Sequence, residues 1–399
     1  MNILFLTLSG IFDLDKHGIY TDLLRKFVQE GHNVYITAPA ERRMHETTSV
    51  KNFDGYCVLR VRTANMQKTN VIEKGIGTLT IEMLFLNAIK KYYGNVKFDL
   101  VLYSTPPITF ANVIYYIKRR DGAKTYLLLK DIFPQNAVDL GMFSKDGILC
   151  KYFRHKEKQL YSQSDYIGCM SQANVDYVLA HNPSVDKNIV HVSPNSIEPV
   201  DIKHDEHRKT ELRAKYNIPL NTTVFVYGGN LGKPQGISFV IECLRANANK
   251  PDRFFVICGT GTEYPKLKRY IDEEHPENVL LINGLPKQEY EDFITSCDVG
   301  MIFLDKRFTI PNFPSRLLSY MQSSMPVLAC TDENTDVGKV ITEGQFGWWC
   351  KAGNVDSFTL TAERVLGENI ISMGKKAHEY LMENYTVQNT YKIIMEHLE

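Results

Sequence analysis

The chain has 399 residues, which is too long for one ordinary hydrophobic core, so its length predicts two domains. Hydrophobic residues make up 44% and charged residues 23%, as is usual for a globular protein. Lys+Arg and Asp+Glu both number 46, and this balance excludes a global electrostatic attraction to nucleic acid, which we do not expect as a partner.

Short apolar runs alternate with helical patterns through the first half of the chain. Ile3–Leu8 is predicted as a strand, with no basic leader before it, and apolar residues then recur at helical spacing from Ile19 to Val28. Gly31 ends this helix, and Val34–Ile36 is the next strand. Later strands are predicted at 100–104, 125–129, 166–169 and 190–192. This alternation predicts an α/β fold with a doubly wound parallel sheet.

The second half repeats this architecture after a polar stretch, Glu198–Arg213, which we interpret as a link. Thr223–Tyr227 is predicted as a strand that runs into a glycine-rich loop and a helix. Further strands are predicted at 254–258, 279–282, 299–303 and 326–330, and one amphipathic helix at about 375–398. The resulting prediction is an N-terminal domain of residues 1–200, a C-terminal domain of residues 201–375, and a helix, 376–399, that packs back on the first domain.

The glycine-rich loop Tyr227–Gly236 is the first candidate site for an anion. Glycines such as Gly229 let backbone N–H groups approach phosphate oxygens closely, and Lys233 adds a positive charge. The spacing fits neither a dinucleotide fingerprint nor a P-loop. A tight turn between strand and helix, without a ligand, remains the alternative.

A second candidate site begins at Pro314, Ser315 and Arg316, where a polar loop is predicted to open a helix. Free N–H groups at a helix start attract anions, and the guanidinium of Arg316 presents a fork of donors suited to a diphosphate. An ordinary turn with a surface arginine is the alternative.

In the first half, Lys130 and Asp131 directly follow the strand predicted at 125–129. A cation at this place stabilises charge on a leaving diphosphate, and a carboxylate can accept a proton from an acceptor hydroxyl. A salt-bridged pair at a strand end is the alternative.

Two more loops follow strands of the first half. Gly18 lies at a predicted helix start, where it permits close approach of the donor sugar or its phosphate, and His17 before it is a candidate acceptor contact. Thr105 and Pro106 end another strand and are predicted to shape the entrance for an acceptor. A histidine alone in a loop is more often simply solvated.

These segments together resemble family 4 glycosyltransferases, which have the GT-B fold of two Rossmann-like domains facing a cleft. Residues 228–236 and the Pro314–Arg316 segment resemble an N-acetylfucosamine-transferase-like branch of capsule and O-antigen enzymes, and Lys130–Pro134 resembles its Arg-Asp-Leu-Trp-Pro segment. The resemblance implies that the first domain binds the acceptor and the second the nucleotide-sugar. It also implies donor contacts by residues in four further segments: Asn230, Gln235, Gly284, Leu285, Ser319 and Glu343.

The sequence departs from the family at two positions where many members have glutamates. Pro311 and Ser319 stand there, and a serine hydroxyl is a weaker partner for a ribose than a carboxylate. This departure leaves a catalytically degenerate partner subunit as one alternative, and a GT-B nucleotide-sugar 2-epimerase is another.

The resemblance implies a retaining transferase that uses a nucleotide-sugar, with a UDP-sugar favoured, and a saccharide or undecaprenyl-diphosphate-linked saccharide as acceptor. No cofactor and no metal ion are expected, since the nucleotide-sugar is a substrate. The expected location is the cytoplasm, on the inner face of the cell membrane, because eight scattered cysteines indicate reduced thiols.

Attachment to an anionic membrane surface is predicted from basic and aromatic residues that alternate in two segments, Leu84–Tyr93 and Leu149–Tyr161. No apolar run approaches the about 20 residues that a membrane-spanning helix needs. Solvated helix faces are the alternative for these basic residues.

Overall fold

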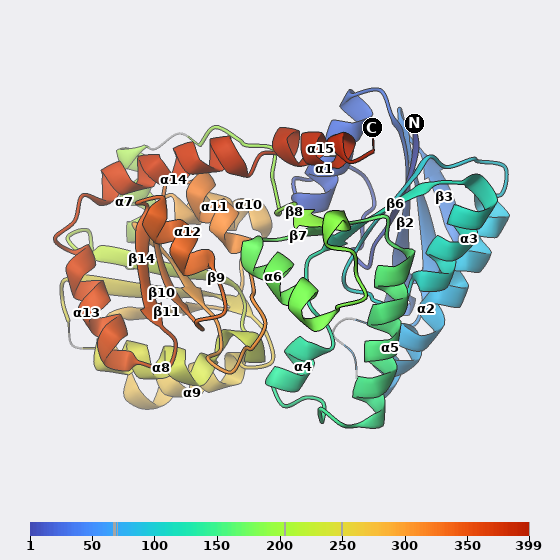
Figure 1. The fold of residues 1–399 in the computed structure, drawn as a ribbon. Coiled ribbons are helices and arrows are strands. Elements are labelled where there is room, and N and C mark those ends of the chain that lie inside the picture. Colours follow the sequence, from blue (N-terminus) through green and yellow to red (C-terminus); the bar gives the residue numbers. More distant parts are fainter. Residues whose placement is uncertain (67–68, 70, 203–204, 249, 399) are drawn as a thin grey trace. The chain divides into compact units, whose positions relative to one another are not determined.

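The computed structural model describes residues 1–66, 69, 71–202, 205–248 and 250–398, and the chain divides into two compact units. The first unit consists of Met1–Glu198 and Thr386–Glu399, and the second is Pro199–Tyr385. Each unit is built around one sheet with helices packed on it (Figure 1). The predicted α/β architecture with two doubly wound sheets is confirmed.

The sheet of the first unit has eight strands in the order β3-β4-β2-β1-β5-β6-β7-β8. All neighbouring pairs are parallel except β3 with β4. The strands are β1 (Asn2–Leu6), β2 (Asn33–Glu41), β3 (Ser49–Asn52), β4 (Tyr56–Thr63), β5 (Leu100–Ser104), β6 (Lys124–Leu129), β7 (Tyr166–Cys169) and β8 (Val190–Val192).

Side chains of β1 alternate between two hydrophobic clusters, one on each face of this sheet. Leu4 and Leu6 join the cluster that includes residues of α2, α3, α5 and α6, whereas Ile3 and Phe5 join the cluster that includes α1 and α15. The helices are α1 (Ile19–Gln29), α2 (Val71–Tyr92), α3 (Ala111–Asp121), α4 (Gln135–Asp139), α5 (Ile148–Gln163), α6 (Gln172–His181) and α15 (Val387–Glu396), with short 3₁₀ turns at Arg42–Met44 and Lys187–Ile189.

The sheet of the second unit has six parallel strands in the order β11-β10-β9-β12-β13-β14. These strands are β9 (Thr223–Asn230), β10 (Arg253–Thr260), β11 (Val279–Ile282), β12 (Val299–Phe303), β13 (Val327–Thr331) and β14 (Gly347–Lys351). The helices are α7 (Glu206–Lys215), α8 (Ile237–Ala246), α9 (Tyr264–Glu274), α10 (Lys287–Ile294), α11 (Arg316–Gln322), α12 (Val337–Glu343), α13 (Val355–Val365) and α14 (Ile370–Asn384), with a 3₁₀ turn at Lys233–Gln235.

The end of the chain differs from the single helix predicted for residues 376–399. Helix α14 ends at Asn384, and α15 starts afresh after Thr386, whose side chain accepts the N–H of Asn389 as an N-cap. The division between units therefore falls at 385/386 rather than at 375. Helix α15 packs on α1, with the rings of Tyr391 and Phe27 5.0 Å apart.

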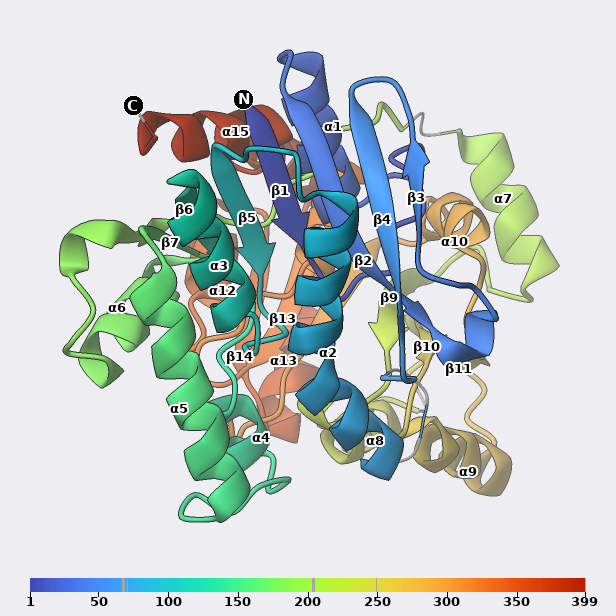
Figure 2. The ribbon, with the colours of Figure 1, turned by 90° about the vertical axis from the view of Figure 1, so that its right-hand side faces the viewer.

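Because parallel strands point the same way, the loops that follow them gather at one edge of each sheet. In Figure 2 the strands of the first unit are seen from the side of α2 and α5, and β5 runs toward the edge at which both helices begin. No helix in the described part of the chain is long and apolar enough to cross a bilayer.

Candidate functional site

Arg316 is the best-defined feature at the carboxyl edge of the second sheet. Its guanidinium carbon lies 4.1 Å from the centre of the Tyr227 ring, so the two groups stack. Gly229 has a φ of 128°, and a Cβ there would lie 3.3 Å from Nη2 of Arg316. The Nη1 atom is buried and makes no hydrogen bond within the described part of the chain. A hydrogen-bond donor that is held in place and has no acceptor, as Nη1 is here, is suited to binding an anionic ligand.

Helix α11 holds Arg316 in this position through a second side chain one turn later. The hydroxyl of Tyr320 accepts the N–H of Gly228 at 3.2 Å and lies 3.2 and 3.1 Å from the carbonyl oxygens of Val226 and Met301. Because Tyr320 is fully buried, these bonds tie α11 to the ends of β9 and β12. Residues i and i+4 share a helix face, so Arg316 lies above the same strand end.

The loop after β9 is stabilised by its own polar side chains. The Oε1 atom of Gln235 accepts the N–H of Gly232 at 3.0 Å and a bond from Nδ2 of Asn230 at 3.3 Å. Gln235 and Asn230 therefore shape the loop in this structure, and their predicted contacts with a donor are not tested. Lys233 is exposed in the 3₁₀ turn, where its ammonium group is open to solvent.

Two predicted residues follow β11, which is the edge strand of the same sheet. Gly284 has a φ of 72°, and a Cβ there would approach the side chain of Thr260 at the end of β10 within 3.0 Å. The N–H of Leu285 donates to the thiol of Cys258, whose pKa burial raises to about 11. The ends of β9, β10 and β11 thus lie together, as the sequence predicted for a ligand edge.

Helix α11 carries the remaining predicted residues of this segment. Pro314 is half-buried and Ser315 is exposed directly before the helix, and Ser319 is exposed one turn into it. The carbonyl groups of Pro314 and Ser315 accept the first helical N–H bonds. These positions lie close to Arg316 in the chain, but within the described residues no hydrogen bond joins Ser319 to the glycine-rich loop.

The structure does not bring Glu343 to this edge. Helix α12 runs back from the end of β13, and Glu343 is its last residue, four positions before β14 begins at Gly347. Gly347 pairs with Val327 at the start of β13, which is the opposite edge of the sheet. The Glu343 side chain is 67% exposed and lies 3.9 Å from Lys339, so this prediction is corrected to a solvated helix end.

In the first unit, Thr105 organises the loop that carries Lys130 and Asp131. Its hydroxyl oxygen accepts the N–H of Lys130 at 3.0 Å and of Asp131 at 3.2 Å, and it donates to the Asp131 carbonyl at 3.1 Å. Thr105 is fully buried, so its side chain has no surface with which to contact an acceptor. Its neighbour Pro106 is exposed between two cis peptide bonds.

Burial changes the protonation of both candidate catalytic groups. Desolvation lowers the pKa of Lys130 to about 7, and its Nζ has the Ser193 carbonyl at 3.5 Å. Desolvation also raises the pKa of Asp131 to about 6, although Nδ2 of Asn136 donates to both of its carboxylate oxygens at 2.8 Å. The two groups do not form the salt bridge that was the alternative interpretation, and sequence reasoning missed Asn136.

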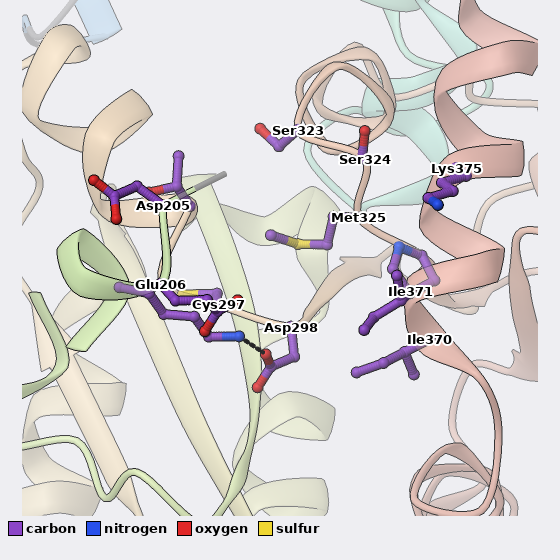
Figure 3. A pocket seen from close by; sticks show the side chains of 13 residues that line it. Asp205, Glu206, Cys297, Asp298, Ser323, Ser324, Met325, Ile370, Ile371 and Lys375 are labelled. Atoms are coloured by element: carbon purple, nitrogen blue, oxygen red, sulfur yellow. Dashed lines mark hydrogen bonds and ion pairs between the residues drawn. The ribbon is translucent and has the colours of Figure 1, made fainter. Parts of the chain in front are cut away.

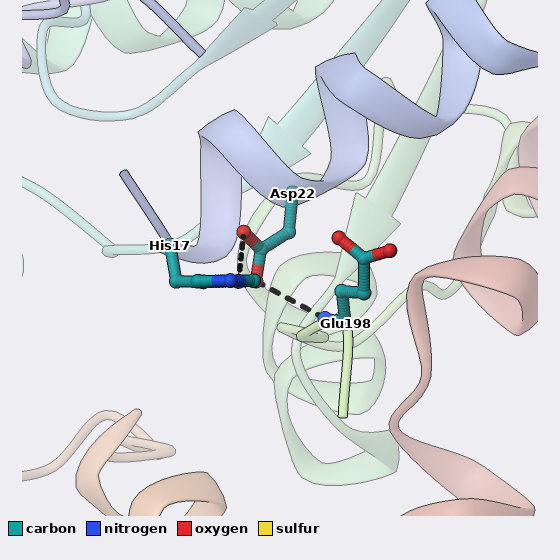
Figure 4. Close-up of side chains that lie close together, drawn as sticks. All are labelled: His17, Asp22 and Glu198. Carbon is teal, nitrogen blue, oxygen red and sulfur yellow. Dashed lines mark hydrogen bonds and ion pairs between the residues drawn. The ribbon is translucent and has the colours of Figure 1, made fainter. Parts of the chain in front are cut away.

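The loop before α1 is held by Asp22, which the sequence analysis also missed. Its buried carboxylate accepts the N–H of Gly18 at 3.0 Å and that of Glu198 at 3.1 Å, and it lies 3.3 Å from Nδ1 of His17 (Figure 4). The amide of Gly18 is therefore already bonded. Arg25 donates to both Asp22, at 2.5 Å, and Glu198, at 3.0 Å.

The ligand atoms of His17, Asp22 and Glu198 lie within 4.8 Å of one another, a spacing that a metal site also shows. The guanidinium of Arg25 already supplies a cation to both carboxylates. The arrangement fits a structural ion-pair network that anchors the loop, so we assign no metal to it.

The aromatic residues predicted to face a membrane are largely packed inside the first unit. Phe85 and Tyr93 are buried in the core, and the Tyr92 hydroxyl donates to the Thr48 carbonyl at 3.0 Å. Phe153 stacks on Phe143 with ring centres 5.8 Å apart. The prediction of an exposed aromatic face is wrong here, because these rings instead pack α2 and α5 against the rest of the first unit.

A cavity of about 420 Å³ lies in the second unit (Figure 3), and none of the predicted donor residues is among the residues that line it. It is lined by Asp298 and Pro326, which directly precede β12 and β13, and by Lys375 on α14. Within it, Nζ of Lys209 is 2.8 Å from Asp298. The cavity opens at the amino ends of the strands, so it is not part of the edge that carries Arg316.

Comparison with known proteins agrees with this architecture. Residues 208–384 match the family model described as glycosyl transferases group 1. The probable glycosyltransferase WbjE of Pseudomonas aeruginosa is 23% identical over 321 residues, which cover 80% of this chain and 78% of that protein. The putative colanic acid biosynthesis glycosyl transferase WcaI of Escherichia coli (strain K12) is 21% identical over 250 residues, covering 61% and 60%. The protein is an enzyme of the glycosyltransferase class.

Solved structures with a similar fold identify the architecture of this glycosyltransferase. Sucrose-phosphate synthase from Thermosynechococcus elongatus superposes with a TM-score of 0.75 at 12% identity, over 99% of this chain and 97% of that one. Anabaena HepE in complex with UDP gives a TM-score of 0.71 at 15% identity, over 100% and 99%. The glycosyltransferase therefore has the GT-B fold, as the sequence predicted.

Proposed function

We propose that the enzyme moves a sugar from a nucleotide-sugar, with a UDP-sugar as the first choice, to a saccharide carried on undecaprenyl diphosphate. The names of two relatives, one of them a colanic acid enzyme, support a role in surface polysaccharide assembly. Structures of HepE contain UDP and UDP-glucose, which supports a uridine donor for this fold. The N-acetylfucosamine-transferase-like branch remains part of the proposal.

Arg316 is the observation that carries the donor assignment. The guanidinium is stacked and half-buried, and its Nη1, which has no hydrogen-bond partner in the described part of the chain, lies beside the glycine-rich loop at Gly229. A diphosphate would satisfy this donor and also accept bonds from loop N–H groups. Lys233, exposed in the same loop, adds a second cation.

The proposed reaction retains the anomeric configuration. The acceptor oxygen approaches the anomeric carbon from the face that the diphosphate leaves. Its bond to that carbon forms there as the bond from the carbon to the diphosphate oxygen breaks, so the configuration is retained. Asp131 takes the proton of the acceptor hydroxyl, and Lys130 stabilises negative charge on the leaving group. No metal ion takes part in this scheme. The protein would act on the cytoplasmic face of the membrane, where its lipid-linked acceptor is presented.

Calorimetry with UDP tests the donor assignment. Arg316→Ala is expected to weaken binding by about 1.5–3 kcal/mol, the scale of a hydrogen bond to a charged group, with Arg316→Lys intermediate. Arg364→Ala is the matched control, because Arg364 is 71% exposed on α13 and pairs with Glu368. Unchanged affinity in Arg316→Ala would refute the assignment.

The two alternatives predict different products. Pro311 and Ser319, in place of family glutamates, are the observation that favours a degenerate partner subunit. Such a subunit binds UDP but neither hydrolyses nor transfers the sugar, whereas an epimerase changes the sugar configuration without an acceptor. Chromatography of purified enzyme incubated with the UDP-sugar, with and without acceptor, separates the three outcomes.

A further inference from the structure

The cavity of about 420 Å³ at the amino ends of β12 and β13 is not used by the candidate donor or catalytic residues (Figure 3). Its volume falls in the range of pockets that hold small molecules. Four segments line it: the start of α7, the turn before β12, the turn between α11 and β13, and the start of α14. All four belong to the second unit, so the cavity is complete within that unit.

One part of the lining is apolar. Met325 and Pro326 come from the turn before β13, and Ile370 and Ile371 come from the first turn of α14. Met325 is buried, whereas 73% of the surface of Ile371 is exposed, so Ile371 lies where the cavity meets solvent. A ligand with an apolar body would remove this aliphatic surface from water, which favours binding.

The turn after α11 and the start of α14 bring a hydroxyl and an ammonium group together. A Cβ at Gly374 would lie 1.9 Å from the carbonyl oxygen of Ser324, so α14 packs directly on this turn. The next residue, Lys375, lines the cavity and forms no ion pair with any described residue. Ser323 is 3% exposed, and its hydroxyl has no hydrogen-bond partner in the described part of the chain. One ammonium group and one hydroxyl suit the two oxygen atoms of a carboxylate.

The acidic residues of the lining are mostly compensated. Asp298 lies 2.8 Å from Nζ of Lys209 and 2.6 Å from Nη2 of Arg213, so two cations balance its charge. The carboxylate of Asp205 caps α7 by accepting two backbone N–H groups, at 2.9 and 3.3 Å. Glu206 is the remaining acid, and Figure 3 shows it on the other side of the cavity from the lysine of α14.

Helix α11 connects this cavity with the candidate donor site. Its first residue is Arg316, and Ser323 directly follows its last residue. The seven residues of this helix span about 10 Å. Ser324 has a φ of 47°, a left-handed conformation that costs free energy in a residue other than glycine. A ligand that holds this turn therefore also holds the helix that carries Arg316.

We infer that the cavity binds a small amphipathic carboxylate and that its occupancy strengthens nucleotide binding through α11. The apolar body of the ligand lies against Met325 and Ile371, and its carboxylate accepts hydrogen bonds from Ser323 and Lys375. A ligand that orders α11 in advance lowers the entropy cost of binding UDP, so the two bind cooperatively. The coupling rests on the proposed donor assignment, whereas binding of the carboxylate is measurable without nucleotide.

Calorimetry with octanoate tests the site. Lys375→Ala should lower the affinity for octanoate about tenfold, the scale of a lost hydrogen bond to a charged group. Ile371→Glu should lower it as much, because the new carboxylate repels the ligand. The matched controls are Lys339→Ala and Leu360→Glu, since these residues are 71% and 65% exposed in the second unit and do not line the cavity. Both controls should bind octanoate as the unaltered protein does.

Two further ligands test the chemistry of the head group. Neutral octanamide should bind about tenfold more weakly than octanoate, because it lacks the charge that Lys375 attracts. Failure of the unaltered protein to bind octanoate, or equal affinity in Lys375→Ala, overturns the inference. Tighter binding of octylammonium also overturns it, because the acidic wall of α7 would then select the ligand.

Ser323→Ala gives a variant that is expected to stay folded. It removes a buried hydroxyl that has no partner, so the melting temperature should not fall, while the affinity for octanoate should. Octanoate should raise the affinity for UDP about fivefold in the unaltered protein. An unchanged UDP affinity overturns the coupling through α11. Absence of UDP binding in a protein that still binds octanoate counts against the proposed function alone.

Discussion

Arg316 and Lys130 carry positive charge in two different surroundings. The guanidinium of Arg316 stacks on the ring of Tyr227, with its carbon 4.1 Å from the ring centre. The ammonium group of Lys130 is different, because burial lowers its pKa to about 7. Lys130 is therefore only partly protonated at neutral pH, and the rate of sugar transfer should vary with pH for this reason.

The pH dependence of kcat/KM follows from the two buried groups. Lys130 must be protonated to stabilise a leaving diphosphate, and Asp131 must be ionised to accept a proton. Their pKa values of about 7 and about 6 place the active form between these limits. We expect the rate to rise through about pH 6 and to fall above about pH 7, and Asp131→Asn should abolish the acid limb.

Asn136 sets the position of the acid limb. Its amide donates to both oxygens of the Asp131 carboxylate at 2.8 Å, and such bonds favour the ionised form and lower the pKa. Asn136→Ala removes them, so the pKa of Asp131 should rise and the acid limb should move to higher pH while the basic limb stays. Gln172→Ala, which removes an exposed amide bonded to Asp176, is the control. An unmoved acid limb would show that Asn136 has a structural role only.

Among the elements, α15 is the one whose start was hardest to predict. The residues before it contain neither proline nor glycine, so the pattern over 375–398 favours one helix. Thr386 starts a new helix because its side chain accepts the Asn389 N–H at 3.3 Å while its backbone bridges to Ile197. That bridge joins segments far apart in the sequence, so the break depends on tertiary contact.

Removing this N-cap tests its contribution. Thr386→Ala should lower the free energy of unfolding by about 1 kcal/mol, the typical worth of a threonine cap, as measured by urea denaturation. Thr210→Ala is the control, since the Thr210 hydroxyl only donates back to Glu206 within α7. Its effect should stay within about 0.5 kcal/mol. An equal loss of unfolding free energy in both variants would show that the Thr386 cap contributes no more than an ordinary threonine.

At the scale of the whole molecule, each unit holds a guanidinium group beside residues that the sequence analysis considered for ligand binding. Arg25 joins the carboxylates of the His17–Asp22–Glu198 cluster, and Arg316 offers its guanidinium at the donor edge. We predict that sugar transfer continues in EDTA, because fixed cations carry the charge of the leaving group. Loss of turnover that magnesium or manganese restores would contradict this prediction, and UDP binding in EDTA serves as the control for folding.

The periodicity of the sequence was sufficient for most of the fold. Runs such as Ile3–Leu6 and Val299–Phe303 are buried on both faces, so their continuous apolar pattern indicates a parallel strand directly. Loops that follow parallel strands all lie at the carboxyl edge of their sheet. This rule was sufficient to predict that Gly229, Lys130 and Asp131 lie at such an edge.

Long-range packing decided the rest. Helix α12 lies between the end of β13 and Glu343 and runs back along the sheet, so Glu343 lies at the edge where the strands begin. Thr105 looked available at a strand end, but its hydroxyl is used by a loop 25 residues later in the chain.

The sequence by itself determined the class of fold and the neighbourhood of the candidate donor-binding and catalytic residues, because local periodicity and strand ends are properties of short segments. Only the tertiary structure decided that Asp22 and Asn136 hold the site and that Phe85 and Tyr93 are buried. The physical reason is that burial and hydrogen-bond satisfaction depend on neighbours distant in the chain, which the spacing of residues does not encode.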